Sequence, residues 1–182
     1  MSELNDRCLN QFPEWLRALA TDATEMSNAV ADAASVNHVA AAHIVGGLNY
    51  LFKSLDLISD GIGELGFLDD AFVVRVAAAL ALREAPALGA SRPALTRLAD
   101  DTTLIAELLG KDYARLENYV RTLRSGAARG RSVDDILNDE QARTAFLNEV
   151  TGWASSYSVP SFSRDEKNLV KLKSFLLAKL PG

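Results

Sequence analysis

The sequence predicts an all-α protein, a compact bundle of about seven or eight helices, on three observations. Ala and Leu are abundant while Val, Ile and Thr are comparatively scarce, and β-branched residues favour strands over helices. No segment of five or more residues alternates between apolar and polar side chains as a half-buried strand would. Apolar residues instead recur three and four positions apart, which is the spacing of one helix face.

The length is that of one domain. A chain of 182 residues hides roughly 70% of its unfolded surface on folding, which is enough for a core without metal or disulfide staples. We therefore expect a single helical domain over residues 1–182. A division into two small domains near Gly89 is the alternative.

Four helices are expected in the first half of the chain. In order, they cover residues 10–33, 36–53, 56–65 and 70–85. Pro13 stands in the first turn of the first helix, where its missing N–H leaves no bond unmade. Val36, Ala40 and Ile44 begin an apolar stripe along the second. Asp69 is expected to cap the fourth.

The second half is expected to hold the remaining helices. In order, they cover residues 94–109, residues 112–125, a short segment opened by Ser132, a segment capped by Asn138 that reaches Tyr157, and a last helix after Pro160. Loops are expected at 86–93 and 126–131. Ser163 and Glu166 have the spacing of a capping box, in which each side chain bonds the other's free backbone N–H.

Cysteine content, hydropathy and charge limit the expected setting and partners. Cys8 is the single cysteine and has no disulfide partner in the chain, so a cytoplasmic location is expected. The polar N-terminus has no signal-peptide core, and the apolar stretches 39–52 and 71–82 are too short to span a bilayer. The first 70 residues hold three basic and eleven acidic side chains, so nucleic acid is not an expected partner.

The most unusual segment runs from Asp56 to Asp70, and we call it the acidic turn. Its sequence is DLISDGIGELGFLDD. Asp56, Asp60 and Glu64 are four residues apart, where like charges on a helix repel one another. Gly61 and Gly63 weaken a helix further. Because the sequence keeps both the repelling charges and the glycines, we expect these positions to have a structural or functional role.

Local architecture is the interpretation of the acidic turn that we favour. Asp56 would lie in the first turn of a short helix, where the helix dipole favours an acid. Gly66 would end that helix in the left-handed conformation. Gly61, Gly63 and Gly66 are then structural turn residues. Lys53 or Arg75 would pair with the remaining acids.

A ligand site is the alternative interpretation. The carboxylates of Asp56, Asp60, Asp69 and Asp70 would gather around Mg²⁺ or Ca²⁺, because hard cations prefer clustered oxygen ligands. An EF-hand is excluded, since its third and twelfth positions would be Ile58 and Phe67, which cannot bind a metal. The favoured expectation is no cofactor, with a Mg²⁺ or Ca²⁺ ion as the alternative.

The segment from Tyr50 to Ala85 resembles the YkvA-like family, a bacterial domain of unknown function. The family motif reads approximately Pro-x-Asp-Leu-Ile-Pro-Asp, followed by Leu-Gly-x-Leu-Asp-Asp. The chain supplies Asp56-Leu57-Ile58, Asp60, Leu65-Gly66 and Leu68-Asp69-Asp70 in register. Ser54 and Ser59 stand in place of the two prolines. The resemblance implies a helical hairpin around a tight acidic turn, membrane-associated in some relatives, with no established reaction.

Other polar and small residues are interpreted as structural. His38 and His43 are five residues apart and point away from each other on a helix, so they cannot share a metal ion. Gly46 and Gly47 lack the spacing of a phosphate loop and are expected to let a neighbouring helix approach, such as the one carrying residues 77–79.

Two basic segments have an alternative functional interpretation. The basic cluster is expected to be a solvated helix end and loop, although it could hold a phosphate or an acidic partner; its members are Arg121, Arg124, Arg129 and Arg131. The last helix carries an apolar stripe of Leu169, Leu172, Leu176 and Leu180 beside several lysines. This pattern is typical of a helix that closes a bundle, and it also suits a membrane surface.

No catalytic motif or zinc pattern is present, so no catalytic residue is assigned. The favoured function is therefore a non-enzymatic one, by interaction with a protein partner or by self-association. One alternative is a metal-binding or small-ligand-binding protein, or a hydrolase, centred on the acidic turn. The other is peripheral association with a membrane surface, at its inner face.

Overall fold

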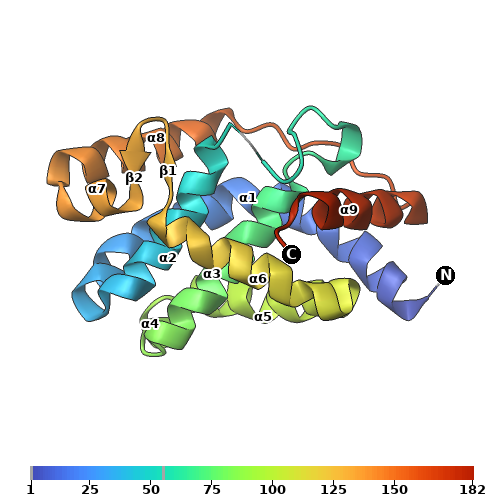
Figure 1. Ribbon diagram of the computed structural model, residues 1–182, viewed down its shortest axis with the longest axis horizontal. Coiled ribbons are helices and arrows are strands. Elements are labelled where there is room, and N and C mark those ends of the chain that lie inside the picture. The colour runs from blue at the N-terminus through green and yellow to red at the C-terminus, as the bar shows by residue number, and fades with distance from the viewer. Residues whose placement is uncertain (1, 55) are drawn as a thin grey trace.

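The computed structural model describes residues 2–54 and 56–182 and confirms the all-α prediction (Figure 1). The α-helices are α1 (Glu3–Val36), α2 (His38–Asn49), α3 (Leu68–Glu84), α4 (Leu88–Ser91), α5 (Pro93–Leu109), α6 (Tyr113–Thr122), α7 (Val133–Asn138), α8 (Glu140–Ser156) and α9 (Glu166–Lys179). Short 3₁₀ helices cover Tyr50–Phe52, Gly63–Leu65, Gly110–Asp112 and Leu123–Ser125. A small antiparallel ribbon joins β1 (Ala127–Ala128) to β2 (Arg131–Ser132), with Ala127 opposite Ser132.

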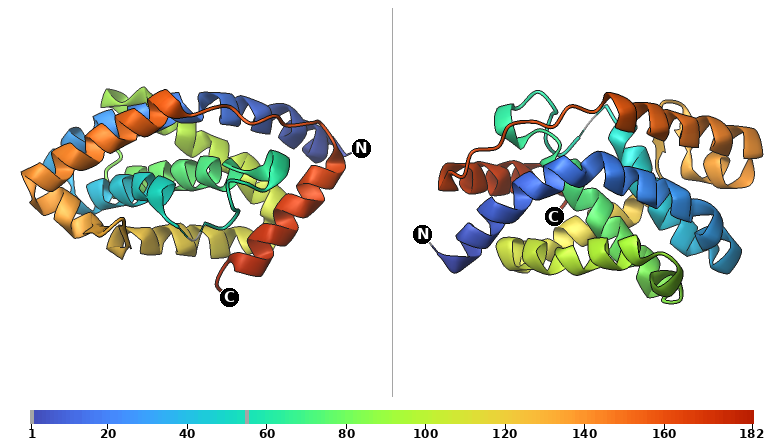
Figure 2. Two further views of the ribbon diagram at one scale, coloured as in Figure 1. Left: turned by 90° about the horizontal axis from the view of Figure 1, so that it is seen from above. Right: turned by 180° about the vertical axis from the view of Figure 1, so that it is seen from behind.

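α3 forms the centre of the bundle. Every residue from 68 to 78 is buried, because α1, α2, α5 and α6 all pack against this helix. In Figures 1 and 2, α9 and α7 lie at opposite ends of the molecule, with α3 between them. A helix covered on all sides is expected to be apolar all round. Asp69, Asp70 and Arg75 are the charged residues that break this rule on α3.

Close approach between α2 and its neighbours depends on two glycines. A Cβ added at Gly47 would lie 2.5 Å from the Cβ of Ala77 on α3, so the predicted contact with residues 77–79 is confirmed. A Cβ at Gly46 would lie 2.9 Å from the backbone of Leu123 and Arg124. The two glycines thus allow α2 to pack closely between α3 and the 3₁₀ helix that follows α6.

The first helix is longer than predicted. It starts at Glu3, with Ser2 as its cap, because the Ser2 hydroxyl accepts the backbone N–H of Asn5 (3.1 Å). Pro13 therefore lies inside the helix and not in its first turn, which corrects the prediction. The longer helix is favoured because Cys8 and other apolar residues before Pro13 are buried in the core.

Other boundaries also differ from the prediction. Residues 56–65 form turns and one 3₁₀ segment instead of an α-helix, and the predicted loop at 86–93 contains α4. The predicted loop at 126–131 is the β-ribbon. Asp139, not Asn138, caps α8, since its carboxylate accepts the N–H groups of Gln141 and Ala142. The predicted cap at Ser132 is confirmed, with a full capping box to Asp135.

The last helix closes the bundle. Its leucine stripe is buried, from Leu169 to Leu180. Its cap is Asp165 and not Ser163, because the Asp165 carboxylate accepts the backbone N–H of Lys167 (2.9 Å). Within the described ranges, none of the helices combines the length and the apolar character that crossing a bilayer demands.

Candidate functional site

Tyr50 and Asp69 hold the start of the acidic turn in place. The Tyr50 hydroxyl donates to Asp69 Oδ2 (2.5 Å) and accepts the backbone N–H of Leu57 (2.7 Å). The same Asp69 oxygen accepts the backbone N–H of Ile58 (3.2 Å). These bonds tie the backbone N–H groups of Leu57 and Ile58 to Tyr50 and Asp69, so the start of the turn is anchored both to the 3₁₀ helix before it and to α3.

Asp69 is not the cap of α3, which corrects the prediction. Phe67 occupies the cap position and makes no side-chain cap bond, and Asp69 lies within the first turn of the helix. Phe67 has the left-handed conformation (φ 68°) that the prediction gave to Gly66. At Gly66, whose φ is −54°, the need is for space, because an added Cβ would lie 2.3 Å from the carbonyl oxygen of Asp60.

Glu64 fixes the other side of the acidic turn to the start of α9. Its Oε2 accepts the backbone N–H of Ser163 (3.1 Å), the Ser163 hydroxyl (2.6 Å) and the side-chain amide of Asn168 (2.7 Å). These hydrogen bonds, those of Ser163 first, lower the pKa of Glu64. They also occupy the Ser163 hydroxyl, so the predicted capping box with Glu166 does not form.

The four aspartates of the acidic turn lie close enough to affect one another. Asp69 and Asp70 are buried, Asp56 is half-buried and Asp60 is exposed. Burial raises the pKa of Asp56 to about 7 and that of Asp69 to about 6. Burial, and then the charge of Asp69, raises the pKa of Asp70 well above its ordinary value. Loss of solvent also raises the pKa of Asp60.

Three buried oxygens of this group have no hydrogen-bond partner among the described residues. They are Oδ1 of Asp56, Oδ1 of Asp69 and Oδ2 of Asp70. Burial and the negative charge of Asp69 both favour a proton on Asp70. When they are ionised, these carboxylates have no hydrogen-bond donor for the three oxygens among the described residues, and Lys53 acts on Asp56 through its charge alone.

The basic partners expected for the acidic turn are engaged elsewhere. Arg75 points to the opposite side of α3 and pairs with Asp22 and Asp101, which corrects the prediction. Lys53 lies over the ring of Tyr119, with its Nζ 5.8 Å from the ring centre, and makes no ion pair within the parts of the chain described. Among the described residues, no cation forms an ion pair with the four aspartates of the turn, and the charge of Lys53 acts on Asp56 without direct contact.

The geometry limits how a metal ion could be held. Within residues 2–54 and 56–182, no three His, Cys, Asp or Glu side chains are grouped so that they could hold one ion together. A cation at the acidic turn would therefore bind to one or two carboxylates directly, with water as the other ligands. Mg²⁺ is commonly bound in this way.

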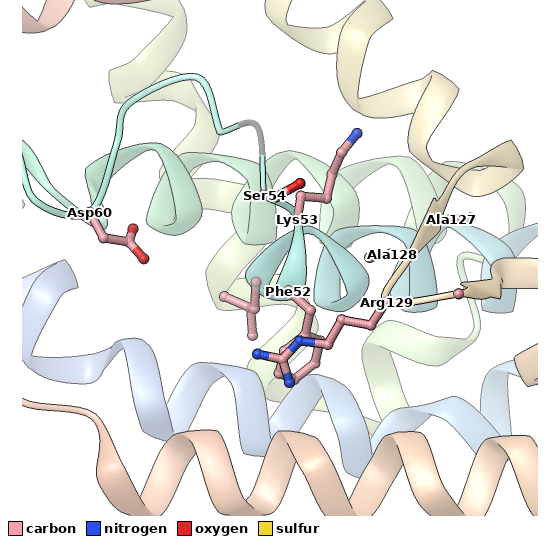
Figure 3. Close-up of a pocket in the computed structure, with 9 residues that line it drawn as sticks. Phe52, Lys53, Ser54, Asp60, Ala127, Ala128 and Arg129 are labelled. Carbon is pink, nitrogen blue, oxygen red and sulfur yellow. The ribbon is translucent and has the colours of Figure 1, made fainter.

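A pocket of about 640 Å³ adjoins the acidic turn at Asp60 (Figure 3). Its lining residues are Leu51, Phe52, Lys53, Ser54, Asp60, Ala127, Ala128, Arg129 and Gly130. Sequence reasoning missed this pocket, because it placed residues 126–131 in a loop. The one local signal is Gly130, since glycine suits the second central position of a two-residue hairpin turn, but arginine is not a typical residue for the first.

The remaining predicted candidates are dispersed. His43 is buried and His38 is exposed, so the two do not meet. The basic cluster is divided between separate acids: Arg121 donates to Glu117 (3.1 Å), and Arg131 donates to Glu149 (2.5 Å). It does not form one basic surface.

Comparison with known proteins identifies one segment. A family model described as "Protein of unknown function (DUF1232)" matches residues 40–75, which include most of α2, the acidic turn and the first part of α3. This supports a family of unknown function over part of the chain, in the segment where the YkvA-like resemblance begins. Neither the curated proteins nor the solved structures contain a significant match to the chain.

Proposed function

We propose that this protein is a non-enzymatic binding protein that takes up a divalent cation, Mg²⁺ or Ca²⁺, at the acidic turn. The observation that supports this is the group of three buried carboxylate oxygens without hydrogen-bond partners, on Asp56, Asp69 and Asp70. Hard cations prefer oxygen ligands of this kind.

Energetic cost favours this function over a purely structural role. A buried carboxylate is strongly destabilising unless it is neutralised or paired. Asp69 stabilises the turn by binding Tyr50 and Ile58 through Oδ2, whereas the Asp56 and Asp70 side chains make no hydrogen bond to the described backbone of the turn. Either protons or a cation must offset their charge, and a cation would displace the protons that burial otherwise keeps on Asp56 and Asp70.

Access to the site is available from one side. Asp60 is exposed and Asp56 is half-buried, so both can meet a hydrated ion from solvent. Since a bound ion would keep most of its water, the absence of a three-residue ligand set among the described side chains is compatible with weak binding.

Calorimetry with MgCl₂ and CaCl₂ tests the proposal. We expect the wild-type chain to bind one of the two ions and to gain thermal stability with ion concentration. Asp56→Asn and Asp70→Asn are expected to weaken the binding, while Asp100→Asn, an exposed acid on α5, leaves it unchanged. The proposal fails if no heat is observed with either ion, or if both turn variants bind as the wild type does.

Self-association is a second candidate function, favoured by an exposed apolar side chain on α9. Val170 is 66% exposed and borders a groove of about 250 Å³ with Leu4 and Leu108. Glu166 and Lys173 line the same groove, so a second copy related by a two-fold axis could pair these opposite charges. Sedimentation of the wild type and of Val170→Asp tests this, since a dimer through this groove would dissociate in the variant.

Membrane attachment through the last helix stays a prediction with less support. The leucine stripe that would enter a membrane surface, Leu169, Leu172 and Leu176 among it, is buried against the bundle. Flotation with anionic vesicles is the measurement that checks it.

A further inference from the structure

The pocket beside the acidic turn is built from three separate segments. The 3₁₀ helix Tyr50–Phe52 and the residues after it form one wall, Asp60 a second, and the ribbon turn Ala127–Gly130 a third. Its volume of about 640 Å³ falls in the range of small-molecule sites. Leu51 and Phe52 give it an apolar portion, while Lys53, Asp60 and Arg129 place charges of both signs along its border.

The backbone turn and the ring of Phe52 hold the Arg129 side chain in position at this pocket. Arg129 and Gly130 both have positive φ angles (50° and 77°), as the central residues of a tight hairpin turn do. The guanidinium lies over the ring of Phe52, 4.8 Å from its centre, which restricts the side chain. A positive φ is costly for arginine, so the turn holds this side chain at the pocket despite local strain.

The guanidinium N–H groups of Arg129 are available to a ligand. It donates no hydrogen bond within the described parts of the chain, and its contact with Glu149 is long, at 3.7 Å. Arg131 approaches the same Glu149 oxygen to 2.5 Å. One carboxylate therefore faces two guanidinium groups, and Arg131 takes the closer position. Arg129 keeps a net positive charge and a planar set of donors for another acceptor.

Asp60 lies across the pocket from Arg129. Figure 3 shows its carboxylate on the far side from Arg129 and Phe52, directed toward the pocket. It makes no ion pair or side-chain hydrogen bond within the described residues. The pocket thus presents a donor group at one end and an acceptor group at the other, with apolar surface between them.

We propose that this pocket binds a small molecule that carries a phosphate or carboxylate group for Arg129 and a hydrogen-bond donor, an ammonium or hydroxyl group, for Asp60. Arginine recognises such oxyanions through paired hydrogen bonds. The site goes beyond the proposed cation function, because it needs neither the buried carboxylates of Asp69 and Asp70 nor a metal ion.

Chemical-shift titration of the ¹⁵N-labelled protein in EDTA tests the proposal. The probes are phosphoethanolamine and β-alanine, which carry an anion and an ammonium group, and inorganic phosphate and ethanolamine, which each carry one of the two. We expect phosphoethanolamine or β-alanine to bind more tightly than either single-charge probe, with shifts at residues 127–130 and at Asp60. EDTA removes divalent ions, so failure here leaves the cation proposal untouched, and the converse also holds.

Three variants test whether Arg129 and Asp60 bind the two charged groups of the ligand. Arg129→Gln is expected to weaken binding about tenfold, since a hydrogen bond to a charged group is lost. Asp60→Asn should bring the double-charge probes down to the level of inorganic phosphate. Arg164→Gln, an exposed arginine outside the pocket, should change nothing. The proposal is overturned if none of the probes shifts these residues, or if Arg129→Gln binds as tightly as the wild type.

A last measurement separates a free ligand from a lipid headgroup with the same chemistry. Vesicles of phosphatidylethanolamine in phosphatidylcholine are tested for capture of the wild type and of Arg129→Gln. Capture that Arg129→Gln abolishes would support the pocket and assign its ligand to a lipid surface. Binding of soluble phosphoethanolamine without capture would support the pocket and assign a free small molecule.

Discussion

Two groups of buried charge lie on α3, and they are compensated in opposite ways. Arg75 is fully buried, yet its guanidinium donates to Asp22 (3.2 Å), Asp101 (3.0 Å) and the carbonyl of Ala71 (3.1 Å). It also lies 4.3 Å from the ring centre of Trp15. Asp69 and Asp70 lie about a turn and a half earlier on the same helix. In the described part of the chain they pair with no cation, and two of their buried oxygens have no hydrogen-bond partner.

The two groups differ in how their buried charge is compensated: Arg75 is paired within the protein, whereas the aspartates of the turn depend on protons or a bound cation. The Arg75 group has two carboxylates and a carbonyl around one cation, and Arg97 further pairs with Asp22 (2.7 Å). Such a group ties α1, α3 and α5 together within the chain. The acidic turn gathers charges of one sign, so its compensation has to come from protons or from a bound cation. This contrast is the reason for placing the candidate site at the turn.

Breaking the Arg75 group is expected to have the largest effect. Arg75→Met would leave Asp22 and Asp101 short of their shared cation in a buried setting, which typically costs about 3–5 kcal/mol. Chemical denaturation measures the loss in the free energy of unfolding. Arg83→Met is the matched control on the same helix, because Arg83 is exposed and its pair with Glu117 is worth at most about 1 kcal/mol. Equal losses in the two variants would contradict the comparison.

His43 is a buried base, and its effect on the pH dependence of stability is opposite to that of the buried aspartates. Burial, then the charge of Arg124, lowers its pKa from 6.5 to about 4, with Glu84 opposing and Arg121 adding to the shift. A depressed folded-state pKa means that its stability is present above pH 6.5 and lost as the pH falls toward 4. The loss is at most about 3 kcal/mol.

Denaturation between pH 4 and 7, in the wild type and in His43→Gln, checks this expectation. The variant should lose less stability on acidification than the wild type. The raised pKa values of Asp56 and Asp69 act in the opposite sense, since protonation on acidification favours their folded state. The difference between the two proteins therefore isolates His43, and parallel curves would exclude its role.

Tyr50→Phe tests how the acidic turn is held. The variant removes the donor to Asp69 and leaves the buried backbone N–H of Leu57 without its acceptor, while Asp69 Oδ2 keeps the backbone N–H of Ile58. A loss of about 1–3 kcal/mol in the free energy of unfolding is expected. Tyr119→Phe is the control, since Tyr119 packs edge-on against Tyr50 and its hydroxyl has no hydrogen bond among the described residues. A smaller loss for Tyr50→Phe than for the control would show that the hydroxyl does not hold the turn.

Asp70→Asn is expected to have the smallest effect on stability, and Asp22→Asn is the matched variant in the Arg75 group. Asp70→Asn replaces an acid that burial already favours in its neutral form, so in EDTA at pH 7 we expect a change below about 1 kcal/mol. Asp22→Asn removes the carboxylate that Arg75 and Arg97 share, and a loss of about 3 kcal/mol or more is expected. Thermal and chemical unfolding measure both. A larger loss for Asp70→Asn than for Asp22→Asn would reverse our interpretation of the two groups.

Helical periodicity predicted most of the fold because burial of an apolar stripe is a local property of the sequence. The helices at 94–109 and 112–125 were placed within a few residues of α5 and of α6 with its flanking 3₁₀ segments. Helix ends were less predictable, since several side chains in a row can cap. Asn138 and Asp139 are both suitable, and Asp139 is the cap because Asn138 is the last residue of α7.

Interactions across the chain explain the wrong expectations at the acidic turn. Local rules made Asp69 a cap and Gly66 a left-handed residue, while Tyr50 from the preceding segment takes the Asp69 carboxylate and the Asp60 carbonyl fills the space at Gly66. Likewise, Ser163 and Glu166 have capping-box spacing, but Glu64 binds Ser163 from 99 residues away. Spacing alone cannot show a partner that is distant in sequence.

Three features could be predicted from the sequence alone: the helical class, the close approach of α2 to α3 through Gly47, and the concentration of aspartates between Asp56 and Asp70. These follow from residue type and spacing, which act locally. The pairing of Arg75 with Asp22, on the side of α3 away from the acidic turn, depends on the packing of α1 against α3 and could not be predicted from spacing. The tertiary structure also brought Arg129 across from Asp60 at one pocket. The physical reason is that compensation of a buried charge depends on which distant side chains the fold places beside it.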